Sequence, residues 1–168
     1  MEITKVQLSD AKKIMGIYKA VVKELRANEI YQWDRFYPNS FVIREDIKNG
    51  YVYGIKEEST YVGVIVLNTN QSAKYKQITW NEMEGTPLVI HRLAVHPGHQ
   101  GKGIGRQLMQ FALQFAREHG HLSIRLDVYT KNPHAVTMYE RAGFEKRGQI
   151  KFPFRNDPYI CMEKSLFS

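Results

Sequence analysis

The feature that most constrains the fold is a glycine-rich stretch, residues 96–106, which joins two segments of different periodicity. Before it, residues 88–95 (LVIHRLAV) are largely apolar, as in a buried strand. After it, residues 103–119 repeat apolar side chains at the spacing of one helical face: Ile104, Leu108, Phe111 and Phe115. A helix that begins at such a turn presents unpaired amide N–H groups and the positive end of its dipole. The stretch therefore predicts an anion site, for which phosphate is the usual ligand.

Three alternating glycines, Gly101, Gly103 and Gly105, favour a ligand site over a simple connection. Glycine accepts positive φ and lets the backbone approach a ligand, whereas each glycine inside a helix costs about 1 kcal/mol of stability. Lys102 and Arg106 add positive charge at the rim of the turn. The P-loop string G-x-x-x-x-G-K-[ST] is absent, and so is the dinucleotide fingerprint G-x-G-x-x-G, because position 106 is arginine.

The remaining periodicity predicts an α/β sandwich around one mixed sheet, built as a single domain over residues 1–168. Further helices are expected over 10–27, 40–48 and 133–142, and further strands over 2–8, 51–57, 60–68, 122–128, 144–150 and 159–166. Ser9 or Asp10 is the expected cap of the first helix, and Glu58 and Ser59 are expected to turn a hairpin. Residues 69–86 are expected to form a loop, with irregular strand as the alternative.

The formal net charge is +7, which raises the question of nucleic-acid binding. The basic residues are spread along the chain and form no stripe, so a solvated basic surface or a small polyanionic ligand is preferred, with a nucleic-acid-binding module as an alternative. One cysteine, Cys161, excludes an internal disulfide. We expect no signal peptide and no membrane span, and hence a cytoplasmic protein.

Two segments resemble the GNAT superfamily of N-acetyltransferases. Residues 100–105 (QGKGIG) match its Q/R-x-x-G-x-G/A signature, and residues 93–97 (LAVHP) are similar to the L-A-V-x-P that precedes it. Residues 132–144 (NPHAVTMYERAGF) resemble the segment N-x-x-A-x-x-x-Y-x-x-x-G-F of the family. The resemblance implies a mostly antiparallel sheet of about six to seven strands flanked by about four helices.

The resemblance also implies acetyl-CoA as cosubstrate, with no metal. The pyrophosphate is expected on backbone amides of the turn, namely Gln100, Gly101, Lys102, Gly103, Ile104, Gly105 and Arg106. Backbone of Leu93, Ala94 and Val95 is expected to follow the pantetheine arm where the strand splays from its neighbour. Asn132 and Tyr139 are expected on the opposite wall. His96 and His99 are interpreted as surface residues, or at most as further phosphate contacts.

The implied reaction is a direct attack of a primary amine on the thioester, without an acyl-enzyme. The Leu93 N–H is the expected oxyanion donor, and Tyr139 is the expected acid for the departing thiolate. His91 is a candidate base, because strand periodicity puts it on the face of Leu93. A buried histidine satisfied by the backbone is the other interpretation of His91. A carboxylate acting through water is the alternative base: Glu29, Asp34, Glu82 or Glu84.

The acceptor side is expected in the aromatic segment 30–38, where Trp33, Asp34 and Tyr37 can hold a cation by stacking and charge. Anchoring of this segment to the core is an equally supported interpretation. The loop over 69–86 can form a second rim through four residues: Tyr75, Trp80, Glu82 and Glu84. The sequence does not separate a small amine, an amino acid, an antibiotic or a protein amine. A homodimer is compatible with the size of the chain, and a noncatalytic CoA sensor is the alternative function.

Overall fold

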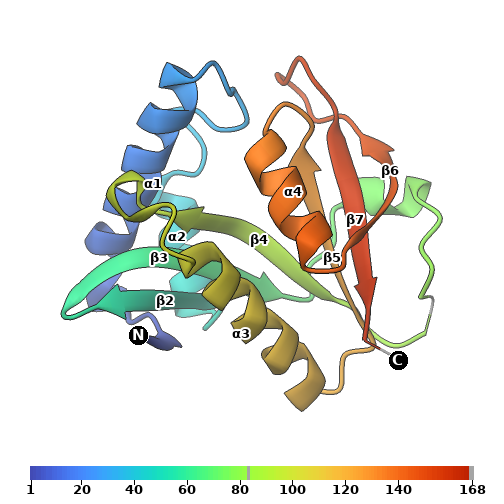
Figure 1. Ribbon diagram of the computed structural model, residues 1–168, viewed down its shortest axis with the longest axis horizontal. Helices are drawn as coiled ribbons and strands as arrows, with labels where there is room; N and C mark the ends of the chain where they lie inside the picture. The colour runs from blue at the N-terminus through green and yellow to red at the C-terminus, as the bar shows by residue number, and fades with distance from the viewer. Residues whose placement is uncertain (83, 167–168) are drawn as a thin grey trace. The chain divides into compact units, whose positions relative to one another are not determined.

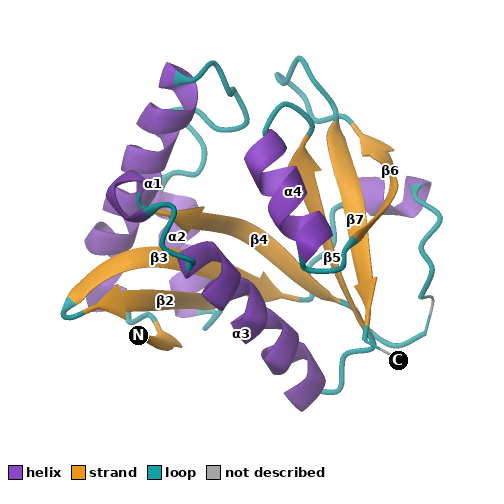
Figure 2. Cartoon of the chain, viewed as in Figure 1, coloured by secondary structure: helices purple, strands orange, loops and turns teal. Residues whose placement is uncertain are grey.

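The computed structural model describes residues 1–82 and 84–166, in which strands and helices succeed one another along the chain (Figures 1 and 2). They form two compact units, which are described separately. The first comprises Met1–Leu67 and His91–Phe111, and the second comprises Asn68–Ile90 and Ala112–Ser168. The boundaries pass through two strands and one helix, and the prediction of a single domain stays a prediction.

The first unit carries a meander of three antiparallel strands and two helices. Its elements are β1 (Glu2–Lys5), α1 (Ala11–Ala27), α2 (Ser40–Lys48), β2 (Val52–Glu57) and β3 (Thr60–Asn68). Strand β4 (Leu88–Val95) and helix α3 (Ile104–Glu118) contribute His91–Val95 and Ile104–Phe111 to the same unit.

Apolar stripes of α1 and α2 form the core of the first unit with inward side chains of the strands. Ile14 and Tyr18 of α1 are fully buried, as is Ile43 of α2. Val64 of β3 joins the same cluster. On β3, a Cβ at Gly63 would lie 3.0 Å from Ile104. The absence of a side chain at Gly63 therefore lets the start of α3 approach the strand closely.

The second unit is built on antiparallel strands. It contains β5 (Ser123–Tyr129), α4 (Pro133–Arg141), β6 (Glu145–Ile150) and β7 (Tyr159–Ser165). Strand β7 pairs with β5 on one side and with β6 on the other. The beginning of β4 pairs with β5 in parallel, at Leu88 and Val89.

The expected α/β class is confirmed, because the described residues form seven strands in the order β1-β2-β3-β4-β5-β7-β6 together with four α-helices. Four of the five strand pairs with a defined direction are antiparallel and one is parallel, so the sheet is mixed and mostly antiparallel. Across the described ranges, no helix is long and apolar enough to cross a membrane.

Two local expectations need correction. The first strand ends at Lys5 instead of residue 8, because Leu8–Asp10 turn into a 3-10 helix that leads into α1. Asp10 does precede α1, but its carboxylate makes no capping bond, since it accepts from the Tyr61 hydroxyl at 3.0 Å. Within the described part of 69–86, the ordered element is a 3-10 helix over Ala73–Gln77, and no strand is present.

Candidate cofactor site

The path of the glycine turn is set by hydrogen bonds at its start. The His96 ring accepts from the Gly98 amide at 3.0 Å, which caps a 3-10 turn over Pro97–His99. The Gln100 side chain then reaches back and donates to the Val95 carbonyl at 3.2 Å. The Gln100 amide itself lies 3.5 Å from the Pro97 carbonyl. Gln100 therefore serves the turn with both its side chain and its amide, and its contact to a cofactor stays a prediction.

The next residues leave their amides open. Gly101 and Gly103 have φ of +80° and +79°, which L side chains rarely adopt, and a Cβ at either would meet no heavy atom within 4 Å. None of the six backbone amides from Gly101 to Arg106 donates a hydrogen bond to another described residue. The helical ladder begins with the Gln107 amide, which donates to Gly103 at 3.0 Å. This open amide cradle, defined as residues 101–106, fits a phosphate group.

The charges around the cradle are mixed. Lys102 is half exposed and lies 3.9 Å from the Glu57 carboxylate, while Arg106 is exposed. The same carboxylate lies 2.9 Å from the ring nitrogen of His99, which is half-buried. Glu57 was not identified from the sequence. This residue ends β2, and only the fold brings it close to His99 and Lys102, some forty residues later in the chain.

The strand before the turn carries a conformational irregularity. Arg92 has φ of +44°, and its carbonyl accepts a hydrogen bond from the Tyr18 hydroxyl at 2.7 Å. A left-handed residue interrupts the alternation of a strand, so the period-two argument that linked His91 to Leu93 does not carry across Arg92. Both residues are half-buried, and Ala94 beyond them is buried. The roles assigned to His91, Leu93 and Val95 stay predictions.

The Arg92 side chain forms a largely buried network that sequence reasoning also missed. Its guanidinium forms an ion pair with Asp46 of α2 and donates to the Tyr37 hydroxyl at 2.8 Å. Burial raises the pKa of Asp46, and Arg92 opposes that rise. An arginine within an apolar strand is a detectable signal, but its partners lie 46 and 55 residues away and cannot be identified from local pattern.

The candidate acceptor residues occupy different environments. The Trp33 ring is buried edge-on against Tyr18, with centroids 5.7 Å apart. The Asp34 carboxylate closes its own turn by accepting from the Phe36 and Tyr37 amides at 2.8 and 3.0 Å. Tyr37 is 37% exposed and accepts from Arg92. The structure thus links Tyr37 to β4, whereas Trp33 packs in the core, and substrate contact by all three stays a prediction.

In the second unit, Tyr139 belongs to α4 and Asn132 directly precedes this helix. Asn132 caps this helix by accepting from the Ala135 amide at 3.3 Å. Tyr139 is 8% exposed and packs edge-on against Phe144. Burial, with a smaller contribution from Asp127, raises the pKa of Tyr139 above its ordinary range. Within the described residues, the Tyr139 hydroxyl makes no hydrogen bond.

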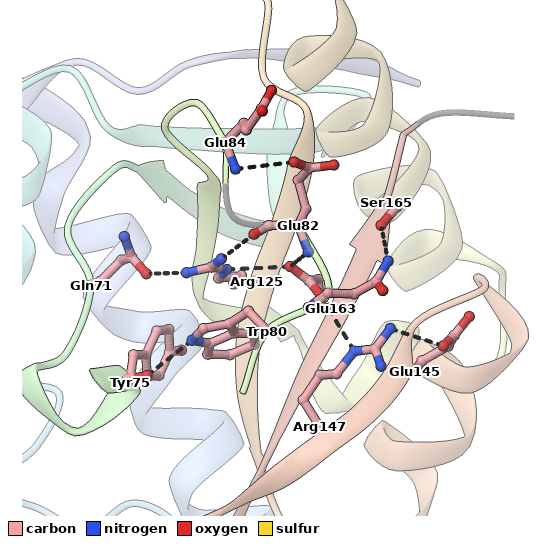
Figure 3. Close-up of polar contacts among 11 residues, drawn as sticks. Gln71, Tyr75, Trp80, Glu82, Glu84, Arg125, Glu145, Arg147, Glu163 and Ser165 are labelled. Carbon is pink, nitrogen blue, oxygen red and sulfur yellow. Dashed lines mark hydrogen bonds and ion pairs between the residues drawn. The ribbon is translucent and has the colours of Figure 1, made fainter. Parts of the chain in front are cut away.

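Residues 71–82 are held by a buried charge network around Glu163 (Figure 3). Glu163 is 1% exposed, lies 3.5 Å from Arg125 and 3.3 Å from Arg147, and accepts from the Asn81 amide at 2.7 Å and from the Glu82 amide at 3.3 Å. Arg125 in turn donates to the Glu82 carbonyl at 2.6 Å. This segment is therefore anchored to β5 and β7 through backbone groups.

The aromatic residues of this segment are buried in the same network. Trp80 lies under the Arg125 guanidinium, 4.3 Å from its carbon, and Tyr75 donates to Asp127 at 2.7 Å. Of the four residues expected at a second acceptor rim, Tyr75 and Trp80 are thus buried, whereas Glu84 is exposed. Glu29, another candidate carboxylate, is exposed just after α1.

Other reactive groups can be placed as well. Burial and Asp127 raise the pKa of Cys161 to about 12, so this residue remains a thiol at neutral pH. Among the residues with described positions, no group of three His, Cys, Asp or Glu side chains is arranged to hold a metal ion.

Comparison with known proteins identifies the family. Residues 18–144 match the model of the acetyltransferase (GNAT) family. The streptothricin acetyltransferase of Escherichia coli is 30% identical over 115 residues, which cover 68% of this chain and 59% of that protein. The chain thus spans about three fifths of the length of this relative.

Solved structures share the fold. A GNAT family acetyltransferase of Streptococcus agalactiae has a TM-score of 0.80 at 20% identity, over 98% of this chain and 94% of that one. The yncA protein of Salmonella typhimurium, solved with its cofactor acetyl-CoA, has a TM-score of 0.73 at 21% identity, over 99% and 94%. At these identities the likeness concerns the fold alone.

Proposed function

Because the chain belongs to the acetyltransferase (GNAT) family, we propose that it transfers the acetyl group of acetyl-CoA to a primary amine. The observation that carries the proposal is the open amide cradle, in which six consecutive amides have no acceptor among residues 1–82 and 84–166. Unpaired N–H groups at a helix start bind phosphate oxygens well, and the helix dipole adds to the attraction. Lys102 and Arg106 supply further positive charge beside the cradle.

The residues of the chain divide the chemistry among them. The acetyl carbonyl is attacked by a neutral amine, so negative charge grows on its oxygen, and the Leu93 N–H is the proposed donor to that oxygen. As the carbon–sulfur bond breaks, the thiolate needs a proton, which the Tyr139 phenol is proposed to donate. Because burial raises the pKa of Tyr139, its phenol carries its proton at neutral pH and has a proton to donate. The products are an N-acetylated amine and free CoA.

The amine must first lose a proton. His91 is the proposed base, and a carboxylate acting through water is the alternative. Trp33, Asp34 and Tyr37 are the proposed contacts of the acceptor amine. Tyr37 is the most exposed of them, with 37% of its surface accessible, whereas Trp33 is buried. A screen of polyamines, amino acids, an aminoglycoside-type antibiotic and peptides, read out by acetyl-CoA-dependent thiol release, identifies the acceptor class.

The cradle is tested with a matched pair of glycine variants. Gly103 and Gly120 have φ of +79° and +75°, and a Cβ at either meets no atom within 4 Å. Gly103→Ala and Gly120→Ala should therefore lose similar stability, about 1 kcal/mol, from the left-handed backbone. Only Gly103→Ala should weaken acetyl-CoA binding, by about 10- to 100-fold, because its methyl group occupies the space where phosphate approaches.

Isothermal titration with acetyl-CoA measures the two affinities, and thermal melts measure the two stabilities. Equal affinity of both variants would place the phosphates elsewhere. Binding without thiol release across the whole acceptor screen would favour a noncatalytic sensor over an enzyme.

A further inference from the structure

The peptide group between Arg92 and Leu93 is held in an unusual orientation. Arg92, with φ of +44°, is a non-glycine residue in the left-handed region inside a strand, whereas Glu29, Glu58 and Phe154 adopt positive φ in turns and loops. A left-handed conformation costs a residue with a side chain about 1–2 kcal/mol, and such a conformation persists only where the surroundings determine it.

Two separate contacts determine it here. The Tyr18 hydroxyl, from α1, donates to the Arg92 carbonyl at 2.7 Å. The Arg92 guanidinium is held by Asp46 of α2 and by the Tyr37 hydroxyl. The backbone and the side chain of one residue are thus fixed from two helices and from the segment between them.

The hydrogen bond from Tyr18 has a consequence for the next amide. In a trans peptide the carbonyl of one residue and the N–H of the next point in opposite directions. Because the Arg92 carbonyl points at the Tyr18 hydroxyl, the Leu93 N–H points away from it. Tyr18 therefore sets the direction of the amide that is the proposed oxyanion donor.

We propose that Tyr18 is a positioning residue for acetyl transfer, whose hydroxyl holds the Arg92 carbonyl and thereby aims the Leu93 N–H at the thioester oxygen. This inference rests on the proposed function and adds a residue that contacts neither the cofactor nor the acceptor. Asp46 and Tyr37 support the same peptide through the Arg92 side chain.

The environment of Tyr18 suits this role. Tyr18 is fully buried, and burial raises the pKa of its phenol, so that the hydroxyl remains a donor at every pH suitable for an assay. A buried ring that only filled space would need no hydroxyl, because phenylalanine has nearly the same shape without a polar group to desolvate. The hydroxyl is matched to one acceptor, the Arg92 carbonyl.

Tyr18→Phe removes this hydroxyl and keeps the ring. We expect kcat to fall by about 10- to 100-fold. A misdirected Leu93 N–H still stabilises the oxyanion in part, so the loss of rate should be smaller than the loss on removing an oxyanion donor altogether. The affinity for acetyl-CoA should stay within about twofold of the wild type, since the cradle amides are unchanged. The control is Tyr61→Phe, which removes the hydroxyl of another tyrosine, less buried than Tyr18, whose bond goes to Asp10 at 3.0 Å instead of to the Arg92 carbonyl.

Two readouts separate positioning from mere stability. The carbonyl stretch of bound acetyl-CoA labelled with ¹³C at the thioester should move to lower frequency on the wild type and on Tyr61→Phe, and less on Tyr18→Phe. The Leu93 amide resonance in a ¹⁵N spectrum should shift in Tyr18→Phe and stay in place in Tyr61→Phe. If Tyr18→Phe does not fold, Asp46→Asn weakens the second support of the same peptide, and the same kcat loss with unchanged affinity is expected.

Wild-type kcat and an unmoved Leu93 resonance in Tyr18→Phe would overturn the inference. A wild-type protein that neither binds acetyl-CoA nor releases thiol would instead overturn the proposed function, while the Leu93 resonance would still report whether Tyr18 fixes the peptide. The two failures are therefore distinguishable.

Discussion

The two units each contain backbone amides beside basic side chains, and they differ in whether the protein supplies the anion. In the second unit, Glu163 accepts from two loop amides and lies between Arg125 and Arg147, with 1% of its surface exposed. In the first unit, the amides of residues 101–106 have no acceptor in the described part of the chain, and the Lys102 and Arg106 side chains beside them are exposed. Amides beside basic side chains therefore stabilise the fold where a carboxylate of the protein accepts from them, and they form a candidate ligand site where the protein supplies no anion.

The geometry around each set of amides explains this division. The loop amides of Asn81 and Glu82 meet a carboxylate that β7 carries into the interior, so their hydrogen bonds are satisfied on folding. The cradle instead lies at a helix start with two left-handed glycines that leave open space on their Cβ side. Nothing in the described chain fills that space, which is the condition for an external phosphate to bind.

The largest expected effect comes from removing the internal anion. Glu163→Ala removes the carboxylate shared by the buried Arg125 and the half-buried Arg147, and we expect the free energy of unfolding to fall by about 3–5 kcal/mol. The control is Glu145→Ala, which removes an ion pair of the same Arg147, but one whose carboxylate is 71% exposed. That variant should lose no more than about 1 kcal/mol. Urea unfolding measures the stability of both variants. Equal losses of unfolding free energy would show that burial of Glu163 adds nothing to the strength of its ion pairs.

Two tyrosines extend the comparison from amides to hydroxyls. Tyr75 donates to Asp127 at 2.7 Å, whereas Tyr139 makes no hydrogen bond to a described residue. Tyr75→Phe should therefore cost about 1–3 kcal/mol of stability and leave kcat within about twofold of the wild type. Tyr139→Phe should lower kcat by roughly 100-fold and spare both stability and acetyl-CoA affinity. Steady-state kinetics and thermal melts measure both variants. A loss of kcat in Tyr75→Phe together with a loss of stability alone in Tyr139→Phe would contradict the assignment.

The pH dependence of the wild type tests the same acid. Because burial raises the pKa of Tyr139, its phenol keeps its proton beyond the ordinary range near 10. The alkaline fall of kcat that belongs to this acid should therefore lie above about pH 10. A fall in kcat with an apparent pKa between about 7 and 9 that disappears in Tyr139→Phe would show that the pKa of this phenol is lowered instead of raised.

The smallest expected effect concerns the carboxylate beside the cradle. Glu57 lies 2.9 Å from the His99 ring and 3.9 Å from the Lys102 ammonium, so it competes with a phosphate for Lys102. Glu57→Gln should raise the affinity for acetyl-CoA about two- to threefold at low ionic strength, and the gain should vanish in high salt because the pair is partly exposed. The control is Glu58→Gln, an exposed neighbour in the hairpin turn. Weaker binding of Glu57→Gln would show that this carboxylate supports the cradle.

Local pattern was sufficient for most elements. The alternating and helical periodicities predicted β4 over 88–95 and α2 over 40–48 with the bounds that the structure has. The first strand was predicted too long, because the apolar alternation of residues 2–8 continues into residues that turn toward α1. Asp10 illustrates the limit of capping rules, since a tertiary partner, Tyr61, takes the carboxylate that the rule assigns to the helix.

The sequence by itself determined the glycine turn, since the conformations and open amides at Gly101 and Gly103 follow from residue type and from the helix that begins there. It also indicated the family, through two segments whose spacing local rules can detect. Only the tertiary structure decided which groups meet: Tyr18 with the Arg92 carbonyl, and Arg125 with Glu163. Such contacts join residues 38 to 74 positions apart. These contacts depend on which polar groups are buried and on where those groups point. Packing of the whole fold determines both, whereas the periodicity of the sequence predicts neither.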